Sequence, residues 1–170
     1  MSAAANPSEA DETYLHPREN PDFTGHGDAE KTLLDAFNSG RLAHAWLITG
    51  PRGVGKATLA YRFARHVLAT GGAESPGSLF ADGLPENPGG GLYLAPDDPV
   101  FLRVASRGHA DFLAIERSVN PKTGKLRTEI VVDDVRTIGG FLNLTPAEGG
   151  WRVVVIDCAD DMNRSSANAV

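Results

Sequence analysis

Apolar residues recur at intervals of one, three and four residues in two stretches of the chain, which predicts two amphipathic helices in its first half. The first, residues 28–38, carries Leu33, Leu34 and Phe37 on one side and stops before Gly40. The second, residues 55–69, carries a longer apolar stripe, made of Leu59, Ala60, Phe63, Ala64, Val67 and Leu68. Each helix therefore has one face that needs a core to pack against.

Three short apolar runs, residues 45–48, 112–115 and 153–156, predict strands. Wholly apolar strands are expected where helices cover both faces of a parallel sheet. We expect Asp133 to cap a further helix. Its apolar positions are Val135, Ile138, Phe141 and Leu142. The alternation of strand and helix predicts an α/β fold, a three-layer sandwich with a mostly parallel sheet.

Two segments break this pattern. Residues 1–15 are small, polar and acidic, without apolar periodicity, which predicts a disordered tail. Residues 71–99 hold seven glycines and five prolines in 29 positions, and no Lys or Arg. Such a stretch is too long for a routine connection, so it predicts a Gly/Pro-rich insertion within one domain over residues 16–170.

Charge and cysteine content narrow the classes of function. The 170 residues include 16 basic and 22 acidic ones, a net charge of −6, and residues 1–30 supply seven of the acids and one base. The remaining chain is neutral at 15 against 15, so no overall field would hold nucleic acid by charge alone. The single cysteine, Cys158, excludes an internal disulfide and a four-cysteine zinc site. With no apolar run near the ~20 residues of a membrane span, we expect a soluble, cytoplasmic protein.

The glycine-rich run at residues 50–57 predicts a phosphate-binding loop. The pattern G-x-x-x-x-G-K, between a predicted strand and a predicted helix, is met by Gly50, Pro51, Arg52, Gly53, Val54, Gly55 and Lys56, followed by Ala57. The glycines let backbone N–H groups turn toward a phosphate, the helix N-terminus adds its dipole, and the lysine adds a positive charge. A turn that only connects strand to helix is the alternative.

Two positions of this predicted site depart from an active nucleotide hydrolase. Ala57 stands where Ser or Thr would ligate Mg²⁺, and Thr58 is one residue late, about 100° further round the helix. Asp157, after the run 153–156, would hold a Mg²⁺-bound water, although a turn aspartate is the alternative. Cys158 follows it, where hydrolysing relatives carry a glutamate base. The sequence thus predicts binding of ATP or ADP with Mg²⁺, and little or no hydrolysis.

Longer segments around the predicted site are familiar as a set: Gly25 with His26, residues 44–56, and residues 151–163. Together with residues 16–21 and 132–150 they resemble the bacterial clamp-loader family of AAA+ proteins, and within it most closely the delta-prime subunits of DNA polymerase III. The resemblance covers residues 16–170 and implies a P-loop AAA+ sandwich in a hetero-oligomeric ring. Any enzymatic class it implies is that of the polymerase holoenzyme, a nucleotidyltransferase.

The resemblance implies partners as well as a fold. They are the other clamp-loader subunits, the sliding clamp indirectly, and primer-template DNA through the complex, with no membrane. Delta-prime subunits are stators that are typically impaired in hydrolysis, which agrees with Ala57 and Cys158. In that fold a strand after the last helix lies between the strands at 45–48 and 153–156. We therefore expect this chain to be the N-terminal part of a longer protein.

Several smaller expectations follow. Many relatives bind zinc through four cysteines after the P-loop helix, but residues 71–99 have none, so we expect no zinc and a loop that protease cuts first. Arg107 and the other arginines are expected on solvated faces, Trp46 and Phe63 in the core, and His44 packed at a strand entrance. Two other classes stay open: an active gamma- or tau-like AAA+ motor, and a small-metabolite P-loop kinase, for which residues 71–99 lack the arginines of a lid.

Overall fold

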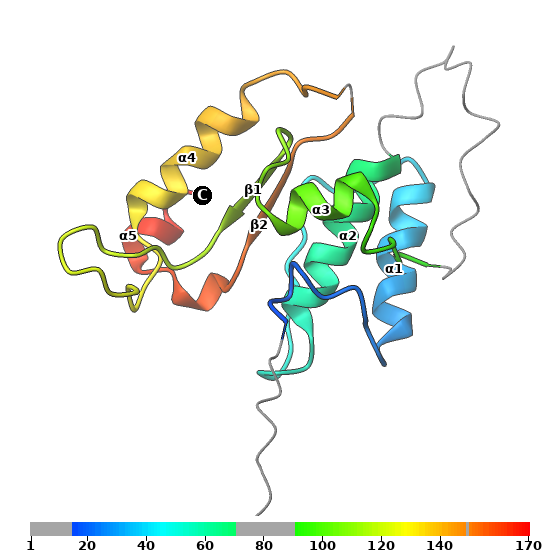
Figure 1. Ribbon diagram of the computed structural model, residues 1–170, viewed down its shortest axis with the longest axis horizontal. Coiled ribbons are helices and arrows are strands. Elements are labelled where there is room, and N and C mark those ends of the chain that lie inside the picture. The colour runs from blue at the N-terminus through cyan, green and yellow to red at the C-terminus, as the bar shows by residue number, and fades with distance from the viewer. Residues whose placement is uncertain (1–14, 71–90, 149) are drawn as a thin grey trace, which may run out of the picture.

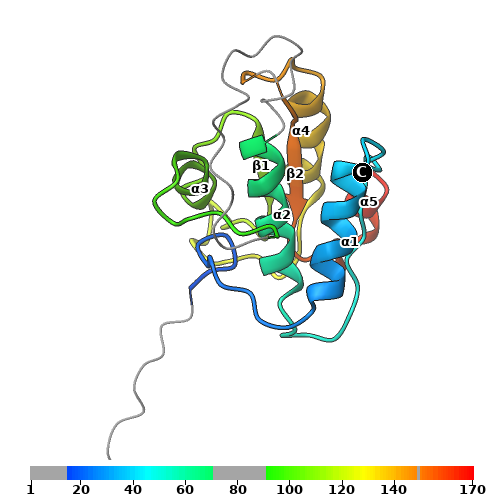
Figure 2. The same ribbon diagram turned by 90° about the vertical axis from the view of Figure 1, so that its right-hand side faces the viewer.

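Helices lie on both sides of a small parallel sheet in the computed structural model, which describes residues 15–70, 91–148 and 150–170 (Figure 1). The elements are α1 (Gly27–Asn38), α2 (Lys56–Thr70), α3 (Pro99–Ala105), β1 (Phe112–Ile115), α4 (Val132–Leu142), β2 (Val153–Ile156), a 3-10 turn (Ala159–Asp161) and α5 (Arg164–Ala167). Helix α2 packs against β2 and α4 against β1, and Figure 2 places α2 between α1 and α3. The predicted α/β class is confirmed, whereas the AAA+ sandwich remains a prediction.

Strands β1 and β2 pair in parallel, from Phe112 opposite Val153 to Ile115 opposite Ile156. The ladder continues past β2, because the N–H of Asp157 donates to the carbonyl of Ile115 at 2.8 Å. Both strands therefore end at one edge of the sheet. These two strands and the helices near residues 28–38, 55–69 and 133–142 agree with the predictions within a residue or two at most boundaries.

The predicted strand at residues 45–48 is wrong for the part of the chain that the structure describes. These residues form no strand, and Trp46 and Leu47 are 43% and 78% exposed. Trp46 is therefore not in the core, and His44 is exposed rather than packed. An apolar run becomes a strand only where its backbone groups find ladder partners, and the described sheet has two strands, with β1 as the neighbour of β2.

The C-terminal boundary of the expected insertion at 71–99 is placed too late in the sequence. Residues 71–90, like residues 1–14 of the expected tail at 1–15, lie outside the described residues, but the segment from residue 91 packs on the domain. Leu92 is fully buried, and its N–H donates to Glu30 at 3.2 Å. Helix α3 then begins at Pro99, capped by the Asp98 carboxylate, which accepts from the N–H of Val100 at 2.7 Å. An Asp before a Pro is a helix-start signal.

The N-cap of helix α4 lies two residues earlier than expected, so the predicted cap at Asp133 is wrong. Val131 is the N-cap residue and makes no side-chain cap. Asp133 lies in the first turn with Asp134, where a carboxylate still favours the helix through the positive end of its dipole. The Asp134 carboxylate accepts instead from the Ser118 hydroxyl at 2.9 Å.

Helix α2 is the centre of the packing, and two of its arginines are buried rather than solvated. Arg62 is 5% exposed and Arg65 is 1% exposed. Tyr61 and Ala64 of the same helix join Phe112, Val155 and Val104 in the central hydrophobic cluster, and Leu59 joins Leu33 and Leu92 in a second one beneath α1. The helix therefore meets the rest of the domain on most of its circumference, which is more than its apolar stripe predicts.

Asp111, one residue before β1, is a buried carboxylate that joins the segment before β2 to the start of β1. Its carboxylate is 2% exposed and accepts from the N–H groups of Ala147 and Glu148 at 2.8 and 2.9 Å, with Arg152 at 3.3 Å. Burial alone would raise the pKa of Asp111, but these hydrogen bonds and the guanidinium together lower it. A lowered pKa adds stability at neutral pH that is lost as the pH falls through the folded-state value.

We predict that Asp111→Asn lowers the free energy of unfolding by about 1–3 kcal/mol at pH 7, because buried donors lose a charged acceptor. The difference from wild type should shrink as the pH is lowered. Urea unfolding of the full-length protein at several pH values measures both. Asp97→Asn, at an exposed position of the same residue type, is the control and should change stability by less than about 0.5 kcal/mol. Equal effects of both substitutions would contradict the prediction.

Candidate functional site

The predicted phosphate loop, residues 50–56, leads directly into α2. Gly53 and Gly55 have φ angles of 85° and 89°, a left-handed backbone that favours glycine. Pro51, Arg52 and Gly53 are exposed, while Val54 and Gly55 are half-buried. A Cβ placed on Gly53 would meet no atom within 4 Å, so the loop is open at this point. Its backbone can therefore be reached by a ligand from solvent.

Lys56 turns its side chain back over the loop. Its Nζ donates to the carbonyls of Gly50 and Pro51 at 2.9 and 2.7 Å. The ammonium group therefore lies at the helix N-terminus, where the dipole favours an anion. A lysine and a helix N-terminus converging on an open glycine loop fit a phosphate group. These residues are suited to hold the phosphates of a nucleotide.

The next position supports a different role. Ala57 is half-buried and packs against the central cluster that contains Tyr61, Phe112 and Val155. A methyl group carries no oxygen that could ligate Mg²⁺. Thr58 is also half-buried, one position further round the helix. Position 57 therefore supplies no direct metal ligand.

Asp157 stands at the carboxyl edge of the sheet, directly after β2, as the sequence predicted. The register places Glu116, which follows β1, beside it at the same edge. Burial raises the pKa of the Asp157 carboxyl, and the negative charge of Glu116 raises it further. Lys56 bonds to the loop carbonyls rather than to Asp157. The two halves of the predicted site are thus carried by neighbouring elements, α2 and β2, which pack together.

Cys158 follows Asp157 and is exposed. Desolvation by the surrounding residues raises the pKa of its thiol, and the nearby Asp157 and Asp161 charges raise it further. The thiol therefore keeps its proton at neutral pH. A protonated thiol cannot accept a proton from an attacking water, so this position does not supply a general base.

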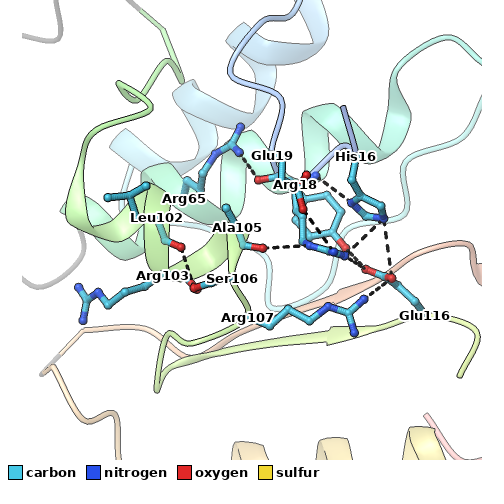
Figure 3. A network of polar contacts seen from close by, with 11 residues as sticks. His16, Arg18, Glu19, Arg65, Leu102, Arg103, Ala105, Ser106, Arg107 and Glu116 are labelled. Carbon is cyan, nitrogen blue, oxygen red and sulfur yellow. Dashed lines mark hydrogen bonds and ion pairs between the residues drawn. The ribbon is translucent and has the colours of Figure 1, made fainter. Parts of the chain in front are cut away.

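Glu116 is the centre of a polar network that the sequence did not reveal (Figure 3). Its carboxylate accepts from the Tyr61 hydroxyl at 2.7 Å and from Arg18 at 3.3 Å, and it also contacts Arg107. His16 lies 3.8 Å away. Burial alone would raise the pKa of Glu116, but the tyrosine hydrogen bond and the surrounding cations together lower it. Glu116 is therefore a fixed negative charge beside Asp157.

The sequence offered one signal of this network, which is the position of Glu116 directly after a predicted strand. Its partners come from three other parts of the chain, so no local pattern could have assembled it. Arg107 is exposed on one side, as expected for a surface residue, but is held by this pairing. Within the described ranges, no group of three or more His, Cys, Asp or Glu side chains is arranged to hold a metal ion.

Comparison with known proteins gives three matches. A family model described as DNA polymerase III, delta subunit, matches residues 99–170. DNA polymerase III subunit delta' of Pseudomonas aeruginosa is 30% identical over 128 residues, which is 75% of this chain and 32% of the relative. DNA polymerase III subunit gamma of Buchnera aphidicola is 26% identical over 141 residues, which is 82% of this chain and 31% of the relative.

These matches support membership of the clamp-loader subunit family of DNA polymerase III. The resemblance drawn from the sequence is thereby confirmed at the level of the family. The chain spans about a third of the length of these curated relatives. Each helix that the structure describes is too short or too polar to span a bilayer.

The neighbouring carboxylates at the sheet edge give a testable electrostatic coupling. We predict that Glu116→Gln lowers the pKa of Asp157, because it removes a negative charge that favours the protonated carboxyl while Arg18 and Arg107 remain nearby. Carbon-detected NMR titration of the Asp157 carboxyl measures the shift. Glu129→Gln, at an exposed glutamate outside the network, should leave it unchanged. An unaltered or higher pKa in Glu116→Gln would show that the two groups are not coupled.

Proposed function

We propose that this chain is a delta-prime-like stator subunit of the DNA polymerase III clamp loader, which helps load the sliding clamp onto primed DNA. In this proposal its nucleotide site binds ATP or ADP and hydrolyses little of it. The observation that carries the proposal is that the site has the residues for binding phosphate but lacks a residue for binding metal directly. The phosphate-binding pattern, Gly50 to Lys56, is present, whereas the position for a metal ligand is the half-buried methyl of Ala57.

The proposed binding step uses the loop and the start of α2. Backbone N–H groups of residues 50–57 would face the phosphates, with Lys56 exchanging its carbonyl partners for phosphate oxygens. Asp157 would face a Mg²⁺-bound water. Burial and the adjacent charge of Glu116 raise the pKa of Asp157, which favours its protonated form and weakens its contribution to metal binding. Bound Mg²⁺ would supply charge neutralisation of the phosphates. Moderate affinity that depends weakly on Mg²⁺ follows from this arrangement.

Two departures support the lack of turnover. Ala57 provides no hydroxyl for the metal, and the Cys158 thiol stays protonated beside Asp157. A positioned general base contributes typically ~10²–10⁴ in rate, and a metal on the transferred phosphate several kcal/mol more. Loss of both leaves a site that responds to nucleotide without consuming it, which suits a fixed member of an assembly.

The proposed partners follow from the relatives. The curated relatives are named as DNA polymerase III subunits delta' and gamma, so we place this chain in a ring with other clamp-loader subunits. The sliding clamp and primer-template DNA would be engaged through the complex, in the cytoplasm. No zinc is expected to be held by the chain.

A gamma-like motor is the second candidate, because a gamma subunit is among the relatives. A motor needs the metal and the base that Ala57 and Cys158 do not provide, so we rank it behind the stator. Steady-state turnover separates the two.

We predict negligible ATPase activity for the full-length wild type, and no further loss on Lys56→Ala, since there is little activity to remove. Lys56→Ala should weaken nucleotide binding, measured by equilibrium titration with ATP and ADP. The double variant Ala57→Thr/Cys158→Glu, which supplies both missing groups, should raise turnover above wild type. A wild-type rate of order one per second, abolished by Lys56→Ala, would establish a motor instead.

Assembly gives an independent test of the stator proposal. We predict that the full-length protein forms a stoichiometric complex when mixed with gamma- and delta-type subunits of the same DNA polymerase III, seen by size-exclusion chromatography with mass measurement. The Lys56→Ala variant should assemble equally well, because a stator contributes surfaces rather than turnover. Failure of the wild type to enter any complex would contradict the proposed role.

A further inference from the structure

The segment that precedes α1, residues 15–23, crosses the side of α2, and we call it the strap (Figures 1 and 2). Three of its carbonyl groups are held by the buried arginines of that helix. Arg65 donates to the carbonyls of Arg18 and Asn20 at 2.8 and 2.9 Å, and Arg62 donates to the carbonyl of Pro21. These arginines are almost fully buried. If the strap moved away, their guanidinium groups would lose the carbonyl acceptors that compensate for the burial of their charge.

The first part of the strap is fastened to the sheet edge. Arg18 donates through Nε to the carbonyl of Ala105 at 3.0 Å and through Nη1 to Glu116 at 3.3 Å (Figure 3). The side chain of Arg18 is 19% exposed and that of Glu116 is 18% exposed, so this pair is shielded from solvent screening. The strap is thus tied to α3 and to the end of β1 as well as to α2.

The other end of the strap reaches the predicted phosphate loop. A Cβ placed on Gly55 would lie 3.0 Å from Cε2 of Phe23, so the phenyl ring is in contact with that glycine. Gly55 is the residue just before Lys56. Phe23 packs beside the cluster of Leu33 and Leu59, and the guanidinium of Arg62 lies 5.8 Å from its ring centre. The ring therefore contacts both Gly55 and this cluster, whereas residues 51–53 of the loop are exposed.

We propose that Phe23 is a positioning residue for the phosphate loop, and that the arginine contacts of the strap hold it in place. Gly55 keeps a left-handed φ of 89°, which an unsupported glycine would leave readily because it has many other conformations. The ring limits these conformations, and it therefore holds the junction between the loop and the N-terminus of α2 in one conformation. The strap then reduces the ordering cost that a ligand would otherwise meet on binding.

This inference rests on the proposed function only in naming a nucleotide as the ligand. The ordering of the loop by the strap is a property of the chain without ligand. A measurement of loop order and a measurement of nucleotide affinity therefore test two separate statements, and each can fail alone.

The test is native-state hydrogen exchange of the full-length protein without nucleotide, compared between Phe23→Ala and Phe37→Ala. Phe37 is a matched control, since it is a half-buried phenylalanine that packs against His66, near the far end of α2. The amide that we follow for the loop is the N–H of Leu59, which donates to the carbonyl of Gly55 at 2.9 Å and therefore reports how that glycine is held. We expect it to exchange about tenfold faster in Phe23→Ala and at the wild-type rate in Phe37→Ala, with amides of β1 and β2 as the internal reference. Phe23→Leu, which keeps an apolar side chain, should lie between wild type and Phe23→Ala.

A second pair of variants tests the fastening. Arg18→Gln should speed exchange of the Leu59 amide by a few-fold, while Arg103→Gln, which removes an exposed ion pair with Glu148, should not. Uniform acceleration of loop and strand amides would mean that Phe23 only stabilises the fold, and would overturn the proposal, as would loop exchange that stays at the wild-type rate. The leucine and Arg18 variants retain this test if Phe23→Ala does not fold.

Titration of the same proteins with ATP and ADP completes the design. If the loop is ordered by the strap and takes a nucleotide, Phe23→Ala should weaken binding several-fold and Phe37→Ala should not. Wild-type protein that binds neither nucleotide, yet shows the expected exchange pattern, would refute nucleotide binding while supporting the strap. Wild-type affinity in Phe23→Ala, with fast loop exchange, would overturn the role of the ring in ligand binding.

Discussion

The structure depends on two positive charges that are buried on α2. Burial lowers the pKa of Arg65 to about 10, with the nearby charge of Arg62 adding to the effect, so Arg65 still carries its charge at neutral pH in a place that disfavours it. The charge is tolerated because main-chain carbonyls of the strap surround it and its guanidinium lies 4.2 Å from the ring centre of Phe101 in α3. Arg62 is held similarly by Glu30 of α1. One helix thereby fixes the strap, α1 and α3 together.

This arrangement explains why the two parts of the candidate site have a defined relation. The predicted phosphate loop leads directly into α2, and Asp157 directly follows β2, the strand that α2 packs against. Tyr61, one turn beyond the loop, carries the link to the sheet edge through its hydrogen bond to Glu116. Burial and the Glu116 carboxylate raise the pKa of the Tyr61 hydroxyl, so it remains a donor at neutral pH. Displacing α2 would move the loop and disturb the carboxylate pair at once.

The sequence predicted what depends on local pattern and missed what depends on distant partners. Helices with clear apolar stripes and the strands at 112–115 and 153–156 were found because their periodicity is local. Residues 45–48 have the same apolar character, yet they form no strand, because a strand also requires a neighbour to pair with. Spacing along the chain singled out the predicted phosphate loop and Asp157. It did not single out Glu116 and Arg65, since each is defined by contacts with segments about 40–100 positions away.

The absence of a hydroxyl at position 57 is also a matter of packing. The Ala57 methyl lies against the cluster of Tyr61, Phe112 and Val155, so the site and the core share this position. A threonine there adds two heavy atoms at the edge of that cluster, and overpacking a core typically costs about 1–3 kcal/mol. The metal ligand and the close fit of α2 on β2 are therefore in competition. Under the proposed function, a subunit with alanine at this position keeps the packing of α2 and lacks a direct metal ligand, which is a physical reason for nucleotide binding without turnover.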